Sequence, residues 1–358
     1  MPGLVSQTKR TREWSLGLFF LCCVVVLWVL SSFLLNNLFE EKVYSKPFII
    51  TWFNTASFSL YLVPCYFRYW KPSPMEGNHD NLVPETSIGI NNYGIEPLPE
   101  IIEESDDKLH PLTISETLKL SFCFCILWLM SNLLNNASLV YTSVSSQTIL
   151  SSTSSFFTML VGYLVNQETF NKTKIISLVG LLVGVICVTL NDKPQTADVT
   201  PFQTILIGDV LALLGALCYG IYSILLKLKV KDDSRMDMKL FFGFVGVFNT
   251  VLLWPSLLFV HYTGIERFQL PPSRNVWYVL LFNCAISFLA DFLWARAMLL
   301  TSPLTVTVGL CLTIPLALMC DIIFKFKFNS PIYFFGAFLV CFSFYWINKH
   351  EKLDSENS

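Results

Sequence analysis

Few ionisable side chains in this sequence lie inside long apolar stretches, and these are the first residues that could do chemistry. Asp291 lies near the middle of one such stretch, and Arg296 follows five residues later. On a helix of about 3.6 residues per turn, five residues correspond to about 140° of rotation, so the two side chains do not share a face. Lys227 closes another stretch, where its ammonium could reach a polar interface or an anionic ligand. Because an unpaired buried charge is unfavourable, Asp291 needs a partner elsewhere or a ligand.

A second set of candidates carries hydroxyl and amide groups. Eleven of the seventeen residues from 142 to 158 are Ser or Thr. Hydroxyls on a helix either bond back to its own carbonyls and permit tight packing or line a polar path, and both interpretations stay open here. Four residues of this region share one helical face: Gln147, Ser151, Ser155 and Thr158. Asn132 adds an amide in the preceding stretch, and Tyr222 adds a phenol in a later one.

No catalytic or metal-binding motif accompanies these residues. All eleven cysteines fall inside apolar stretches without a CxxC pair, and the chain has only four histidines. This pattern predicts no metal site. The HExxH, GxSxG and Walker patterns are missing as well. We therefore expect a protein that is not an enzyme and needs no cofactor.

Long apolar stretches must position the candidate residues. Hydrophobic residues make up 53% of the 358 and charged residues only 14%, against about 25% charged in an average soluble domain. In hydrocarbon the backbone must satisfy its own hydrogen bonds, which a helix of about 20 residues does. The expected helices cover ten ranges: 14–38, 48–67, 117–140, 145–165, 174–191, 205–228, 240–261, 276–298, 303–325 and 332–348. The sequence predicts an all-α integral membrane protein with ten transmembrane helices, embedded in the lipid bilayer.

The distribution of positive charge predicts the orientation in the membrane. With ten helices both ends of the chain share a side, and that side collects 15 Lys and Arg residues against 7 on the other. Since positive residues are retained in the cytosol, both termini are predicted to be cytosolic. The net charge of −2 leaves no basic surface for nucleic acid, which is excluded as a partner.

The chain divides into two halves between short ends. The prediction is a cytosolic N-terminus at 1–13, a first half at 14–191, a second half at 205–348 and a cytosolic tail at 349–358. The first half contains a hydrophilic insert at 68–114, whose Pro, Asn and acidic residues predict a disordered cytosolic segment.

Self-similarity relates the two halves. An offset of 160 residues pairs Leu133 with Leu293, and it places Ser151 and Cys311 at matching depths around a central cavity. Because five is odd, the second half must be inverted relative to the first. The pattern predicts two inverted five-helix repeats, the architecture of an alternating-access transporter.

Several strings resemble solute carrier family 35 proteins of the F type. They lie at 44–48, 141–158, 208–214, 291–297, 300–303 and 309–317. The resemblance omits only 68–114 and the termini, and it extends in particular to fungal vacuolar-membrane and thiamine-repressible transporters. It implies the drug/metabolite transporter fold, with two inverted five-helix repeats around a cavity. The Gly-Ala-Leu-Asn-Lys string of nucleotide-sugar carriers does not occur here, whereas a thiamine-like cation stays open as substrate.

Together these observations predict a secondary transporter of a small polar organic metabolite, thiamine-like or nucleotide-sugar-like, that works by alternating access. The expected location is the vacuolar membrane, with the Golgi and mitochondrial membranes as alternatives, and a homodimer stays open. Six residues are predicted to line the cavity: Asn132, Gln147, Ser151, Tyr222, Lys227 and Asp291. The alternative is a non-transporting scaffold or receptor acting through the acidic insert. Deletion of 75–108 would abolish scaffolding and spare transport.

Overall fold

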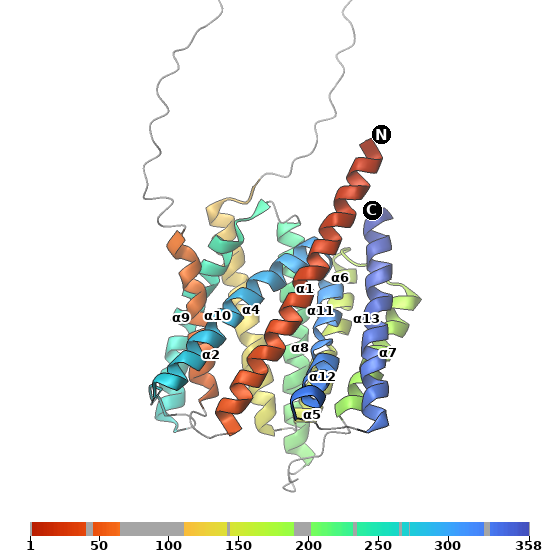
Figure 1. The fold of residues 1–358 in the computed structure, drawn as a ribbon. Helices are drawn as coiled ribbons and strands as arrows, with labels where there is room; N and C mark the ends of the chain where they lie inside the picture. Colours follow the sequence, from red (N-terminus) through yellow and green to blue (C-terminus); the bar gives the residue numbers. More distant parts are fainter. Residues whose placement is uncertain are drawn as a thin grey trace, which may run out of the picture.

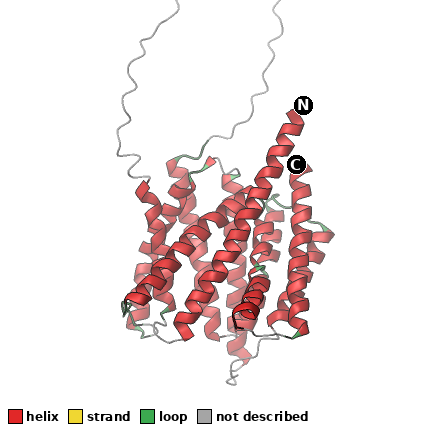
Figure 2. Cartoon of the chain, viewed as in Figure 1, coloured by secondary structure: helices red, strands yellow, loops and turns green. Residues whose placement is uncertain are grey.

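The computed structural model describes residues 2–40, 46–64, 111–141, 144–189, 202–231, 235–264, 267–271, 273–325 and 330–357. Within these ranges every regular element is a helix and none is a strand (Figure 2). This confirms the predicted all-α membrane protein. Residues 68–110 of the predicted insert lie outside the described residues.

The helices follow one another as a bundle (Figure 1). In chain order they are α1 (Pro2–Glu40), α2 (Pro47–Ser57), the 3-10 helix η1 (Phe58–Tyr61), α4 (Ile114–Tyr141), α5 (Val144–Ser152), α6 (Ser154–Leu164), α7 (Lys172–Thr189), α8 (Phe202–Val230), α9 (Met238–Tyr262), α10 (Arg274–Leu300), α11 (Pro303–Leu310), α12 (Thr313–Lys325) and α13 (Pro331–Asn357). Among the described residues, eight helical segments are long and apolar enough to cross a membrane. The other two predicted spans correspond to a shorter apolar helix at Phe48–Pro64 and to the pair α5 and α6.

The predicted span at 145–165 is not one helix, because it divides at Thr153 into α5 and α6. The hydroxyls of Ser152 and Thr153 donate to carbonyl oxygens three residues earlier, at 2.6 and 2.5 Å. Such side-chain bonds compete with the backbone hydrogen bonds of a helix. The Ser/Thr run therefore weakens the helix where it is densest.

The predicted span at 303–325 is divided as well, at Cys311 and Leu312, into α11 and α12. The backbone N–H groups of both residues bond to carbonyls three residues earlier, at 3.1 and 3.0 Å, which tightens the chain into a 3-10 turn. Pro315 follows and has no N–H to donate to the Cys311 carbonyl. The second interruption is thus encoded by a proline.

Close helix pairs join the two halves of the chain. α1 packs along α10, α4 along α8, and α7 along α13 (Figure 1). Between α7 and α13, a Cβ atom added to Gly184 would lie only 2.8 Å from the carbonyl oxygen of Gly336. Two glycines therefore bring these backbones together, as small residues do at helix interfaces in membranes.

The outer surface of the bundle is apolar. Phe19, Ile176, Val251 and Phe338 come from four different helices and are between 61% and 71% exposed. Exposed apolar surface of this extent needs a covering partner, and a lipid bilayer provides it along membrane-length helices.

Both ends of the described chain lie on one side of the bundle, which we call the terminal side (Figure 1). There the Arg10 guanidinium donates to the backbone carbonyl of Ser355. The predicted tail from residue 349 continues the last helix, since α13 extends to Asn357.

Candidate functional site

A cavity of about 240 Å³ lies between the two interrupted helices. Its wall consists mainly of small polar and apolar side chains: Asn135, Thr148, Ser151, Ser152, Ser154, Ala216, Tyr219, Thr307, Leu310, Cys311, Thr313 and Ile314. None of these residues carries a formal charge. We call this space the central cavity.

The interruptions place hydroxyl groups along the central cavity. The Ser151 hydroxyl donates to the carbonyl of Thr148 at 3.1 Å, and the Thr313 hydroxyl donates to that of Leu310 at 2.8 Å. A hydroxyl that donates in this way still has lone pairs to accept a hydrogen bond from a ligand. The wall can therefore receive donors from a bound molecule.

Asn135 adds an acceptor that the protein leaves unsatisfied. Its Oδ1 atom is buried and has no hydrogen-bond partner among the described residues. A Cβ atom on Gly215 would lie 2.8 Å from this oxygen, so the glycine makes room for the amide. Because a buried acceptor without a partner is unfavourable, a donor on a ligand would stabilise this arrangement.

Tyr219 gives the central cavity an aromatic side. Its hydroxyl accepts a hydrogen bond from the Trp294 indole at 3.1 Å, and its ring centroid lies 4.9 Å from that of Tyr222. These contacts fix the orientation of the ring. A fixed aromatic ring can pack against a planar ligand.

Of the six residues predicted to line the cavity, the structure places Ser151 in the wall. Asn132 turns its amide back to its own helix, donating to the carbonyl of Trp128 at 2.8 Å. Gln147 is half-buried on α5, outside the wall, and Tyr222 is buried behind Tyr219.

Asp291 lies on α10 behind this aromatic side. Its carboxyl lies within electrostatic range of Tyr61, Tyr219 and Tyr222. These tyrosines come from η1 and α8. The carboxyl predicted to need a partner thus lies near three phenols, one of which, Tyr219, lines the central cavity.

Lys227 belongs to a different place. Its ammonium donates to the carbonyl oxygens of Leu299 and Thr301, at 2.5 and 2.9 Å, where α10 ends. It lines a second cavity of about 320 Å³, which we call the terminal cavity because it also includes Trp14 and Ser355 near the two chain ends.

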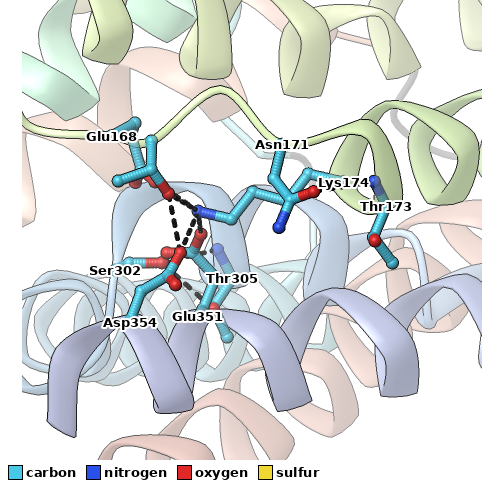
Figure 3. A network of polar contacts seen from close by, with 9 residues as sticks. Glu168, Asn171, Thr173, Lys174, Ser302, Thr305, Glu351 and Asp354 are labelled. Atoms are coloured by element: carbon cyan, nitrogen blue, oxygen red, sulfur yellow. Dashed lines mark hydrogen bonds and ion pairs between the residues drawn. The ribbon is translucent and has the colours of Figure 1, made fainter. Parts of the chain in front are cut away.

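In the wall of the terminal cavity, Lys174 is surrounded by three carboxylates (Figure 3). Its Nζ atom lies 3.5 Å from Glu168, 2.8 Å from Asp354 and in contact with Glu351. Lys174 also donates to the hydroxyl of Thr169 at 3.0 Å. We call these three acids and Lys174 the Lys174 cluster.

The six residues predicted to line the cavity do not include Asn135, Tyr219 and Thr307, which the structure places in its wall. A usable signal existed for Thr307, because the 160-residue offset maps Gln147 onto it. Tyr219 lies one helical turn before Tyr222. By residue type and spacing alone, Asn135 could not be distinguished from Asn136, which directly follows it.

Comparison with known proteins places these features in a family. A family model described as purine nucleobase transmembrane transport matches residues 100–257. A vacuolar membrane protein of Saccharomyces cerevisiae is 46% identical over 98% of this chain and 95% of its own length. The thiamine-repressible mitochondrial transport protein of the same yeast is 37% identical over 93% and 91%.

Solute carrier family 35 member F5 of Mus musculus is 28% identical over 95% of this chain and 78% of its own. A protein of known crystal structure shares the fold with a TM-score of 0.60 at 10% identity, over 96% of this chain and 98% of that one. The chain therefore belongs to the F-type membrane transporters of solute carrier family 35.

Proposed function

We propose that this membrane transporter is a secondary carrier that moves a small polar organic metabolite by alternating access, with the central cavity as its substrate site. The observation that carries the proposal is the position of this cavity at both helix interruptions. Discontinuous helices near the middle of the membrane form the binding sites of many secondary transporters, because their free backbone groups and side chains can contact a substrate.

Two inverted five-helix repeats are part of this proposal. The 160-residue offset maps Ser152, where α5 ends, onto Leu312, which directly precedes α12. The helix pairs that join the halves also support it, since each contains one helix of 14–191 and one of 205–348. With the shorter segment at Phe48–Pro64 and the divided α5 and α6, the eight longer helices make ten spans.

The chemistry of the central cavity favours a small heterocycle as substrate. Its volume of about 240 Å³ lies below the range of roughly 300–1,000 Å³ typical for drug-sized ligands. Hydroxyls, the Asn135 oxygen and the Tyr219 ring fit a planar molecule with hydrogen-bond donors. A nucleotide sugar would bring phosphates, for which the wall offers no cationic side chain. A purine-like base or a thiamine-like molecule, whose positive charge Asp291 could balance, fits better.

The proposed location is the vacuolar membrane with both termini in the cytosol. A relative that is 46% identical is a vacuolar membrane protein. The excess of Lys and Arg on the terminal side supports the orientation.

Uptake into vesicles tests the proposal. Purified protein in liposomes should take up radiolabelled purine bases or thiamine, and Ser151→Phe should abolish this uptake by filling the cavity. A milder matched comparison is Ser151→Ala against Ser177→Ala, since Ser177→Phe would overpack α7. Both serines donate to a carbonyl of their own helix, and of the two only Ser151 lines the cavity, so any loss of uptake is expected for Ser151→Ala. Equal uptake by Ser151→Phe and wild type would contradict the assignment of the central cavity as the substrate site.

A further inference from the structure

The Lys174 cluster joins three parts of the chain on the terminal side. Lys174 lies in the first turn of α7, Glu168 in the segment between α6 and α7, and the other two acids near the end of α13 (Figure 3). The side chains of Lys174, Glu168 and Glu351 are only 1%, 4% and 5% exposed, and that of Asp354 is 39% exposed. The cluster is therefore an interior contact between the two halves of the protein.

The charges in this contact do not balance if every carboxyl is ionised. Three carboxylates against one ammonium give a net charge of −2 in a largely buried place. Burial of unpaired charge is strongly unfavourable, so such a site gains a proton. Other charged groups face the neighbouring surfaces: Lys227 across the terminal cavity, His350 near Asp354, and Arg10 at the Ser355 carbonyl.

The geometry identifies where the proton is held. Glu168 and Glu351 are both buried and both lie against the Lys174 ammonium, whereas Asp354 is 39% exposed and also accepts a hydrogen bond from the Thr169 hydroxyl at 2.7 Å. The excess negative charge is therefore least tolerable on the two buried carboxyls, and a proton on one of them relieves it. The Oε1 atom of Glu351 is buried, and its contact among the described residues is the ion pair with Lys174. A carboxylate oxygen has a further lone pair beside such a contact, so Glu351 can also accept a proton held by Glu168.

We propose that the Lys174 cluster is a proton-binding latch, in which one proton shared by Glu168 and Glu351 holds the segment between α6 and α7 to α13 and closes the terminal side. This inference rests on the proposed transport function, because it assigns the latch to the same path. When the proton leaves to water in the terminal cavity, the remaining charge of −2 drives the acids apart. The protein then opens on this side.

The two cavities lie in series along α11, which supports a path through the latch. Ser302 and Pro303, at the start of α11, line the terminal cavity, whereas Thr307 and Leu310 line the central one. At about 1.5 Å per residue, Pro303 and Leu310 are roughly 10 Å apart. Between them the hydroxyls of Thr158 and Thr307 approach to 3.4 Å, a contact that joins α6 to α11.

Packing around Glu168 shows that its position is specified. Its backbone N–H donates to the carbonyl of Gly162 at 3.2 Å. A Cβ atom on Gly162 would lie 2.4 Å from the Cγ atom of Glu168. The glycine thus admits the carboxyl to the cluster, and burial there, followed by the nearby Glu351, raises the pKa of Glu168 well above its ordinary value.

Hydrogen–deuterium exchange of the full-length protein in nanodiscs tests the latch without any substrate. The readout is the protection of the backbone amides of Gln167 and Glu168, which both bond to Gly162, relative to an unstructured peptide at the same pH. For wild type, protection should fall about tenfold or more between about pH 5.5 and about pH 8, since each unit of pKa difference is worth a factor of ten.

Three variants make the test specific. Glu168→Gln keeps a hydrogen-bonding group without a titrating proton, so its protection should stay high at both pH values. Lys174→Met should be poorly protected at both, and if that variant does not fold, Glu168→Gln alone decides. Lys172→Met removes an exposed lysine of the same helix and should behave as wild type.

A wild-type protection that does not depend on pH, or a Glu168→Gln variant that keeps the wild-type dependence, would overturn the latch. Because exchange is measured without substrate, failure of the latch is distinguishable from failure of the transport assay. If the latch and the transport function are both confirmed, substrate uptake by Glu168→Gln should not show the pH dependence of wild-type uptake.

Discussion

The candidate role of Asp291 could be predicted from the sequence, since a carboxylate inside an apolar stretch is rare and unfavourable. The residues that surround it could not be predicted. Tyr219 and Tyr222 come from α8, about 70 residues earlier in the chain, and only the packing of α8 against α10 brings them near. The same limit applies to Lys227, whose carbonyl partners at the end of α10 could not be inferred from its own helix.

We expect Asp291→Asn to reduce substrate uptake about tenfold or more without reducing the amount of protein in the membrane. The amide keeps the shape but removes a charge, and a hydrogen bond to a charged group is worth about 1.5–3 kcal/mol. Uptake by proteoliposomes with quantified protein measures this. Asp237→Asn is the matched control, because Asp237 caps α9 outside both cavities. Wild-type uptake by Asp291→Asn would mean that the charge of Asp291 is not needed for transport.

At the scale of elements, hydropathy located the helical stretches but not their interruptions. Thr153 and Pro315 mark positions where local hydrogen bonding or a missing N–H outweighs the apolar character of the stretch. The close contact between Gly184 and Gly336 could not be predicted from the sequence either, because a glycine indicates a close approach of two helices only when its partner helix is known.

Gly184→Leu should destabilise the contact between α7 and α13 by roughly 1–3 kcal/mol, the usual effect of overpacking. The added side chain would meet the carbonyl oxygen of Gly336, which belongs to a helix backbone and cannot easily move. Thermal unfolding in detergent measures the effect. Val183→Leu, at an exposed position of the same helix, should change the midpoint little. Equal midpoints for both variants would mean that the close approach is not important for stability.

At the scale of the whole molecule, the even number of crossings is the simplest consequence of the ten-span proposal. Both chain ends lie on the terminal side (Figure 1), and the charge asymmetry predicts that this side is cytosolic. Tags at Met1 and Ser358 should both be digested by protease added outside sealed vacuoles. A single protected tag would rule out an even number of spans.

Stability should also depend on pH through Glu168. Its pKa is raised in the folded state, so the folded protein holds this proton more tightly than the unfolded chain. The resulting stabilisation is complete below the ordinary value of 4.5 and is lost as the pH rises through the folded-state value. The unfolding midpoint of wild type should therefore fall over this window relative to Glu168→Gln, with Asp237→Asn following wild type. Parallel curves for wild type and Glu168→Gln would contradict this assignment.

Thiol labelling of the central cavity tests the account most directly. In a protein cleared of native cysteines except Cys311, a cysteine introduced at Ser151 should react with a small polar reagent, and substrate should protect both positions, which line the same cavity. Ile149 is two residues away, about 200° around the helix, and packs against a buried cluster, so a cysteine there should stay unreactive. Selective, substrate-protected labelling is the predicted result, whereas equal labelling at Ile149 and Ser151 would contradict a single polar face along the transport path.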